Sequence, residues 1–442
     1  MTAGVAFVVA ELLFVSPRMG LSWDETVYVS QVSGHAPAAW FDPARARGVP
    51  LLVAPVAYLT GSIVALRVYL AALSGTGLVL ALLVWRPLRP AWVLALAGVA
   101  FGGLWVAQYY GPQAMPDMWS ALAALAALGF FLRRALAGVA GCVAFMALIR
   151  PGDAVYLAVP LLAAVVAIRA WRRWQLAAAV VCGLVAGGAE WAIEAILRFG
   201  GIAARLHAAG AEQSGFGLHF ALPDELKALN GPTLCRPCVI GYRQPELDLW
   251  WVLLPVIAAV GAVAARRAGD SLASALLPVA CGLCLAAQYL FMIDYAAPRF
   301  LLPAYAVLSI PVADGLAWLV TGVRPDLRLA MAAVVGCAMA AQLAAQHAVL
   351  DHEAGGTVTF HDDYSVIAAR LSSLGVRPPC LVSGVQYIPI GFYAGCASAS
   401  PAGSGIRALL VGTGHRPPAY ARGWRAYPIR GTTVLRVTAY IS

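Results

Sequence analysis

Long apolar stretches separated by short polar segments dominate the pattern of hydrophobic and polar positions along this chain. Each stretch approaches the length at which a helix crosses a bilayer, although several are shorter than the usual ~20 residues. They lie at residues 3–16, 66–85, 91–110, 118–132, 135–149, 154–170, 174–197, 249–265, 271–292, 300–320 and 329–349. The pattern predicts an α-helical polytopic membrane protein with about eleven transmembrane helices.

The distribution of arginine predicts how this bundle is oriented in the cell (plasma) membrane. Cytoplasmic loops are enriched in Lys and Arg, and the arginine clusters of this chain fall in alternate loops. These clusters are Arg86/Arg89, Arg133/Arg134, Arg169/Arg172/Arg173, Arg266/Arg267 and Arg324/Arg328. We therefore expect a cytoplasmic N-terminus, an extracytoplasmic C-terminus and two long external loops, 17–50 and 198–248. Leu51–Val64 is apolar but short, so an interfacial or re-entrant segment is expected there.

The last part of the chain, residues 350–442, has a different character. Ile367–Leu374 can form a helix, whereas Cys380–Ser383, Ala408–Val411 and Thr433–Tyr440 are β-rich runs between Gly and Pro turns. The sequence predicts a transmembrane domain over residues 1–349, followed by a small extracytoplasmic α/β domain.

Composition agrees with a membrane protein: 61% of the 442 residues are hydrophobic and only 12% are charged. The formal net charge is +9, and Lys227 is the only lysine among thirty cationic residues. Because the arginines sit in short clusters between apolar runs, membrane lipids are the expected partners and nucleic acid is not.

Cysteine positions predict two disulfides. Cys380 and Cys396 lie in the external tail and flank a strand–turn–strand pattern, so a structural disulfide is expected between them. Cys235 and Cys238 form one CxxC motif in the second long loop. Zinc requires four ligands, so a local disulfide is a better interpretation than a metal or redox site.

Asp24 and Glu25 are the first charged residues with a candidate chemical role. Charged side chains are scarce in a bilayer protein, and this pair follows the first predicted helix in an aromatic-rich stretch. Asp followed by Glu also suits the first turn of a helix, so a capping role is the simple alternative.

Three more charged residues lie on the same predicted side of the membrane. Asp117 begins the fourth predicted helix, Arg150 follows the fifth and Arg299 precedes the tenth. Each arginine could simply anchor its helix to lipid headgroups. Together, two carboxylate sites and two arginine sites on one rim can hold a lipid phosphate and deprotonate a hydroxyl.

The order of these motifs resembles the GT-C superfamily of membrane glycosyltransferases, which includes protein O-mannosyltransferases, aminoarabinose transferases and bacterial relatives. The similar segments are Trp23-Asp24-Glu25, Ala114-Met115-Pro116-Asp117, Leu148-Ile149-Arg150-Pro151 and Arg299-Phe300-Leu301-Leu302-Pro303. The external α/β tail also matches, so the resemblance covers nearly the whole chain.

The resemblance implies a glycosyltransferase that takes a sugar from a polyprenyl-phosphate donor and transfers it, with inversion, to an extracytoplasmic acceptor. Asp24 would be the general base, whereas Glu25 and Asp117 would orient the acceptor, the sugar or a divalent cation; no cofactor is certain. Arg299, then Arg150, then Arg67 would bind the donor phosphate. The short loop and tail favour a cell-envelope glycan or lipid over protein as the acceptor.

Glu190 and Glu194 lie one turn apart in the seventh predicted helix, so both could face the cavity and contact the acceptor or sugar. The alternative function is a transporter or flippase for a lipid-linked or anionic substrate. Such a protein should carry charges at the membrane midplane and repeat symmetry, whereas the motif charges here lie on the outer rim. A catalytically silent assembly partner would also keep this scaffold.

Overall fold

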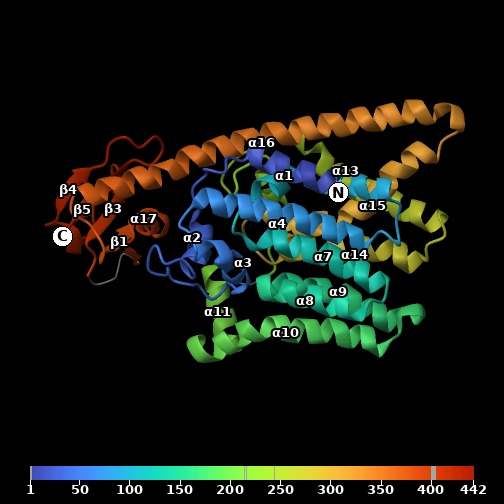
Figure 1. Cartoon of the computed structure of the whole chain (residues 1–442), viewed down its shortest axis with the longest axis horizontal. Coiled ribbons are helices and arrows are strands. Elements are labelled where there is room, and N and C mark those ends of the chain that lie inside the picture. The colour runs from blue at the N-terminus through green and yellow to red at the C-terminus, as the bar shows by residue number, and fades with distance from the viewer. Residues whose placement is uncertain (1, 214, 216, 243, 400–404) are drawn as a thin grey trace.

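The computed structural model describes residues 2–442 apart from 214, 216, 243 and 400–404. Figure 1 shows a bundle of roughly aligned helices, a long helix (α16) along one side of it, and a small sheet at the far end of that helix. The bundle consists of α1 (Thr2–Phe14), α4 (Ile63–Val84), α5 (Ala91–Gly102), α6 (Trp105–Tyr110), α7 (Pro116–Leu132), α8 (Leu136–Ile149), α9 (Pro151–Ala167), α10 (Trp174–Phe199), α13 (Leu249–Arg267), α14 (Leu272–Phe291), α15 (Leu302–Thr321) and the first half of α16 (Arg328–Ser373).

All eleven predicted apolar stretches are helical, but the structure does not fix the number of membrane spans at eleven. Among the described residues, six helices are long and apolar enough to cross a membrane by length and composition. Six shorter apolar helices accompany them. The predicted stretch 91–110 is divided into α5 and α6, because the helix is interrupted at Gly103 and Leu104. The segment around Leu51 forms a separate short helix, α3 (Gly48–Ala57).

Small residues allow close packing between helices of the bundle. A Cβ at Gly187 of α10 would collide with the carbonyl of Ala144 in α8, and one at Gly261 of α13 would collide with the carbonyl of Pro311 in α15. Such backbone approach is the usual way in which apolar helices pack in a bilayer. These contacts bring α10 against α8 and α13 against α15 at backbone distance.

Two long connections form most of the bundle end that faces the tail (Figure 1). The first carries α2 (Trp23–Ser30) and α3, and the second carries α11 (Ile202–Glu212), α12 (Leu222–Ala228) and a 3₁₀ turn (Pro245–Asp248). Helix α2 begins in a capping box, in which Ser22 and Glu25 satisfy each other's backbone N–H groups. The sequence therefore fixes where this short helix starts.

A buried ion pair anchors the first connection to the bundle. Arg67 of α4 pairs with Glu25, and both side chains are fully buried. The second guanidinium nitrogen donates to Glu25 Oε2 at 2.9 Å and to Gly20 O at 2.8 Å. Glu25 also accepts from the Ala114 N–H at 2.9 Å. One ion pair thus joins α2, α4 and the turn between α6 and α7.

Helix α16 continues without a break from the bundle into the tail domain. The boundary predicted at residues 349 and 350 falls inside this 46-residue helix, and the division into two domains stays a prediction. The apolar first half of α16 and most of Ile367–Leu374 belong to one helix, although Gly355 and Gly356 lie between them. The tail domain also contacts the first connection: His361 Nδ1 lies 2.8 Å from Gly20 O, and the Leu21 N–H donates to Tyr393 Oη.

The tail contains a five-stranded mixed sheet in the order β2-β1-β3-β5-β4. Its strands are β1 (Leu381–Gly384), β2 (Ala397–Ser398), β3 (Ala408–Gly412), β4 (Arg425–Pro428) and β5 (Val437–Ile441), with α17 (Tyr387–Tyr393) after β1. Strands β1, β2 and β3 are parallel, whereas β5 pairs antiparallel with β3 and β4. The end of α16 packs on one face through Tyr364, Ile367 and Leu371. The predicted Cys380–Cys396 disulfide is present.

We predict that Arg67→Met destabilises the protein by about 3–5 kcal/mol, because it leaves the Glu25 carboxylate buried without its cation. The Arg67→Met/Glu25→Gln double variant should recover part of this loss, since the buried charge is then absent. Arg18→Met, at an exposed arginine, should change the free energy of unfolding by less than about 0.5 kcal/mol. Thermal unfolding in detergent measures all three. Equal losses for Arg67→Met and Arg18→Met would contradict the anchoring role.

Candidate active site

Two cavities meet at the first turn of α2. The first, which we call the arginine cavity, has a volume of about 510 Å³ and is lined by Asp24, Arg45, Asp117, Arg150 and Arg299, among others. The second, the aromatic cavity, has a volume of about 400 Å³. Its lining combines polar residues with the ring side chains of Trp23, Tyr109, Tyr110, His352, Phe360, His361 and Tyr364. Asp24 and Arg299 line both cavities, so these two side chains stand between them.

Asp24 is held by two arginines from distant parts of the chain. Its carboxylate lies 2.7 Å from Arg45 Nη2 and 3.2 Å from Arg299 Nη2. The side chain remains 31% exposed, so it is the accessible member of the Asp24–Glu25 pair. Burial raises the pKa of Asp24, but Arg45, Arg299 and then Arg150 outweigh it, so this pKa lies below its ordinary value of 3.8. Asp24 is therefore a carboxylate at neutral pH.

Asp117 is a fully buried carboxylate at the start of α7. It follows Pro116 at the first helical position, where the free N–H groups of the helix favour a negative charge. It pairs with Arg150, and its Oδ2 lies 3.5 Å from Arg299 Nε. Two arginines therefore share this carboxylate, and both guanidinium groups are drawn to the same end of the arginine cavity.

Arg150 lies at the sharp turn between α8 and α9. It is both the last cap of α8 and the first cap of α9, because Pro151 prevents α8 from continuing through it. Its guanidinium packs 4.9 Å from the Phe300 ring and 5.2 Å from the Tyr289 ring. These contacts fix its direction toward the cavity while its charge is shared with Asp117.

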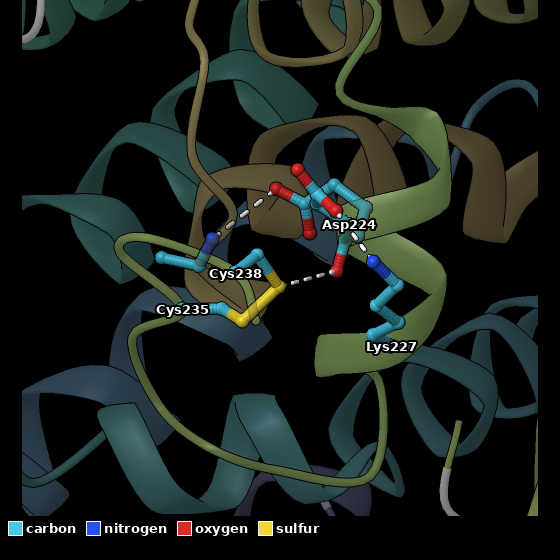
Figure 2. Close-up of a disulfide and its surroundings, with 6 residues drawn as sticks. Asp224, Lys227, Cys235 and Cys238 are labelled. Atoms are coloured by element: carbon cyan, nitrogen blue, oxygen red, sulfur yellow. Dashed lines mark hydrogen bonds and ion pairs between the residues drawn. A yellow bond between two sulfur atoms is a disulfide. The ribbon is translucent and has the colours of Figure 1, made fainter. Parts of the chain in front are cut away.

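Arg299 lies in a 3₁₀ turn (Pro298–Leu301) directly before α15. Its Nη1 donates to the Thr233 carbonyl at 3.3 Å, which attaches it to the second long connection. The predicted disulfide between Cys235 and Cys238 is present two residues further along that connection (Figure 2). The structure thus brings Asp24, Asp117, Arg150 and Arg299 to one place, although they are far apart in the sequence.

Arg45 is a member of the arginine cavity that the sequence analysis missed. It pairs with Asp24 and Asp42 and lies 4.9 Å from the Tyr28 ring. It lies in the loop after α2, within the same long connection as Asp24 and Glu25. A search of that loop for cations near the Asp24–Glu25 pair would have identified it.

Four candidate residues lie outside both cavities. Glu25 and Arg67 pair with each other, and both side chains are fully buried. The expected contact of Glu25 with a substrate and that of Arg67 with a phosphate are therefore not supported. Glu190 and Glu194 were expected to face a cavity, but they hold the loop that carries Arg45. Glu194 pairs with Arg47 at 2.6 Å, and Glu190 accepts from the Arg47 N–H at 3.4 Å.

The same loop is also held from α11. Arg205 is fully buried and pairs with Glu194 at 3.0 Å, while its remaining N–H groups donate to the carbonyls of Pro43 and Arg45. Helix spacing placed the two glutamates on one face of α10 but could not show which neighbours they meet. Among the described residues, no group of three or more His, Cys, Asp and Glu side chains is arranged to hold a metal ion.

The comparisons with known proteins agree on the fold. Neither a family model nor a curated protein matches the sequence. The structure is similar to ArnT from Cupriavidus metallidurans bound to undecaprenyl phosphate, with a TM-score of 0.69 at 13% identity over 99% of this chain and 97% of that one. ArnT in the apo state gives a TM-score of 0.63 at 12% identity with the same coverage.

A second similar structure is the archaeal oligosaccharyltransferase AglB from Archaeoglobus fulgidus in complex with an inhibitory peptide and a dolichol-phosphate. It gives a TM-score of 0.56 at 12% identity over 93% of this chain and 69% of that one. This chain has the fold of GT-C membrane glycosyltransferases. The predicted resemblance is confirmed at the level of fold, and the chain is a multi-pass membrane protein.

We predict that Glu194→Gln loosens the loop that carries Arg45. A hydrogen bond to a charged group contributes about 1.5–3 kcal/mol, so amide exchange over residues 42–46 should be at least about tenfold faster. Glu190→Gln is the matched control, because Glu190 makes only a 3.4 Å contact with this loop. Hydrogen exchange with mass spectrometry measures both. Unchanged amide exchange in Glu194→Gln would show that Glu194 does not hold this loop, and would favour a substrate contact for it instead.

Proposed function

We propose that this protein is an inverting glycosyltransferase. It takes a sugar from a polyprenyl-phosphate-linked donor and transfers it to an extracytoplasmic acceptor, a cell-envelope glycan or lipid rather than a protein. The observation that carries the proposal is the position of Asp24 between two cavities, one rich in arginine and one rich in aromatic side chains. The GT-C fold supports the same reaction class.

The arginine cavity suits the phosphate of the donor. Arg45, Arg150 and Arg299 converge there, and guanidinium groups bind phosphate oxygens through paired hydrogen bonds. Val155 and Tyr156 of α9 also line this cavity, and Val155 is half exposed on the bundle surface. A polyprenyl chain can therefore lie along the apolar bundle surface while its phosphate reaches the arginines.

The aromatic cavity suits the acceptor. Rings that line a cavity can pack against the C–H faces of a sugar, and the polar groups at their edges can bind hydroxyls. Phe360 and Tyr364 of α16 and Gln386 of the tail close this cavity from the tail side. This enclosure, together with the short tail, favours a glycan or lipid acceptor over a folded protein.

Asp24 acts as the general base in this scheme. It accepts the proton of the acceptor hydroxyl as the hydroxyl oxygen attacks the anomeric carbon, and the bond between that carbon and the phosphate oxygen breaks. Polyprenyl phosphate leaves with its charge compensated by the arginines. Because the acceptor and the phosphate occupy cavities on opposite sides of Asp24, attack comes from the face opposite the leaving group, which inverts the anomeric carbon.

The ion pairs of the site explain how Asp24 gains basicity when the donor binds. Its pKa is low because Arg45 and Arg299 pair with it in this structure. A bound phosphate supplies negative charge to the same two arginines and weakens their effect on Asp24. The pKa of Asp24 then rises toward the range in which a carboxylate accepts a proton efficiently.

We predict that Asp24→Asn lowers kcat for sugar transfer by about 10²–10⁴-fold, because general-base assistance is lost while the shape of the side chain is kept. Binding of polyprenyl phosphate should survive. Asp362→Asn, at an exposed carboxylate of α16 outside both cavities, is the matched control and should behave like the wild type. The measurement is transfer of radiolabelled sugar from synthetic polyprenyl-phosphate donors by purified protein in detergent.

Near-normal turnover of Asp24→Asn would remove Asp24 from the role of base. Failure of the wild type with every donor and every envelope acceptor would instead overturn the proposed function. These two outcomes are distinct, because the first still requires a working transfer assay.

We predict that Arg45→Gln moves the acid limb of the kcat/KM profile to higher pH. Asp24 must be ionised to accept a proton, so kcat/KM falls as the pH falls through its pKa. Arg45 is the cation that lowers this pKa most, so removing it raises the pKa and shifts the limb upward. Arg18→Gln, in the same connection but exposed, should leave the profile unchanged. An unshifted limb in Arg45→Gln would show that the limb does not report Asp24.

A further inference from the structure

The backbone just before Arg299 is attached to the second long connection rather than to the bundle. Cys235 and Ala296 form an isolated antiparallel bridge, with N–H to carbonyl distances of 2.9 and 3.2 Å. Ala228, Cys235 and Ala296 are buried together in a small apolar cluster. Arg299 follows Ala296 by only three residues. The position of Cys235 therefore restricts the backbone position of Arg299.

The disulfide between Cys235 and Cys238 closes a tight turn at this bridge. Figure 2 shows the turn lying against α12, with Cys238 beside Asp224. The Cys238 sulfur lies 3.8 Å from the Asp224 carbonyl oxygen, and because a disulfide sulfur carries no proton, this is a packing contact. Cys235 is buried, whereas Cys238 is partly exposed. The disulfide therefore holds the bridge residue against α12 on one side and against Ala296 on the other.

Glu225 of α12 provides the next attachment. The Ala297 N–H donates to Glu225 Oε1 at 3.2 Å. Glu225 is fully buried, and its Oε2 has no hydrogen-bond partner among the described residues. Burial raises the pKa of Glu225 to about 8, although the Ala297 N–H and Arg299 oppose this. A neutral Glu225 holds the Ala297 backbone without cancelling the charge of Arg299.

The guanidinium of Arg299 is attached to the same connection as its backbone. Its Nη1 donates to the carbonyl of Thr233, two residues before the disulfide. The connection itself is fixed to the end of α14, because the N–H groups of His219 and Ala221 donate to the carbonyls of Phe291 and Leu290. Each of these contacts limits the freedom of Arg299 independently of Asp24 and Asp117.

We propose that the disulfide-closed turn Cys235–Cys238 and Glu225 form a positioning unit that sets Arg299 for the donor phosphate. Reduction of this one disulfide then weakens donor binding. The inference rests on the proposed function, since it states what determines donor binding at the phosphate site proposed there. It concerns residues that touch neither substrate, so they act only through Arg299.

The redox step is a thiol–disulfide exchange. A dithiol such as dithiothreitol attacks the partly exposed Cys238 sulfur, the bond between the two cysteine sulfurs breaks and two thiols form. The two electrons and two protons come from the dithiol, which becomes its cyclic disulfide. Without the cross-link, the turn loses the constraint that keeps Cys235 paired with Ala296.

The chain offers a matched control in its second disulfide. The Cys235→Ala/Cys238→Ala variant should bind polyprenyl phosphate about tenfold more weakly, because a small misplacement of a binding group has an effect of this size. Its donor KM should rise by a similar factor. Cys380→Ala/Cys396→Ala removes the tail disulfide, which lies away from Arg299, and should leave polyprenyl phosphate binding unchanged.

Two further measurements guard against a variant that fails to fold. Dithiothreitol added to the folded Cys380→Ala/Cys396→Ala protein reduces the remaining disulfide and should produce the same tenfold loss of binding, reversible on reoxidation. Glu225→Gln keeps an oxygen that accepts from the Ala297 N–H and should bind donor like the wild type. Glu225→Ala lacks this oxygen and should raise the donor KM.

The outcomes separate this inference from the proposed function. Undiminished binding after reduction, or an equal loss when only the tail disulfide is removed, would overturn the positioning unit while sugar transfer by the wild type still stood. Wild-type protein that binds no polyprenyl phosphate in either redox state would overturn the proposed function, and the positioning unit with it.

Discussion

The ion pair between Arg67 and Glu25 is the constraint on which the site depends. It lies fully buried and joins the first connection to α4 and to the turn before α7. Asp24 is the next residue to Glu25 along the chain, and Asp117 lies just after that turn, so one interaction sets the distance between the two carboxylates. A buried pair is costly to break because either charge left alone is strongly destabilising. The position of Asp24 and Asp117 is thus fixed by two charges that line neither cavity.

Much of this architecture could be predicted from the sequence. Apolar stretches located the bundle helices, because a bilayer imposes a length and a composition that few other constraints mimic. The β-rich runs around Leu381, Ala408 and Val437 located three of the five strands. The short motifs around Asp24, Asp117, Arg150 and Arg299 named the charged residues that the structure gathers. Residues scarce in a membrane protein are informative even when each motif is weak.

The predictions that failed depended on contacts between distant segments. Helix spacing showed that Glu190 and Glu194 share a face, but only the fold shows that this face meets Arg47. Position at the outer start of the second predicted helix suggested a phosphate contact for Arg67, whereas the side chain pairs with the buried Glu25. Sequence periodicity reports the environment of one element. The identity of a charged partner is a property of two elements, and it cannot be obtained from either alone.

Helix α16 has a consequence beyond linking the two domains. Its 46 residues correspond to a rod about 69 Å long, which lies along one side of the bundle and ends at the tail sheet. Phe360 and Tyr364 lie on the outer part of this rod and close the aromatic cavity. An unbroken rod converts tilt within the membrane into displacement at its far end. A tilt of this rod would therefore move Phe360 and Tyr364, and with them one wall of the aromatic cavity.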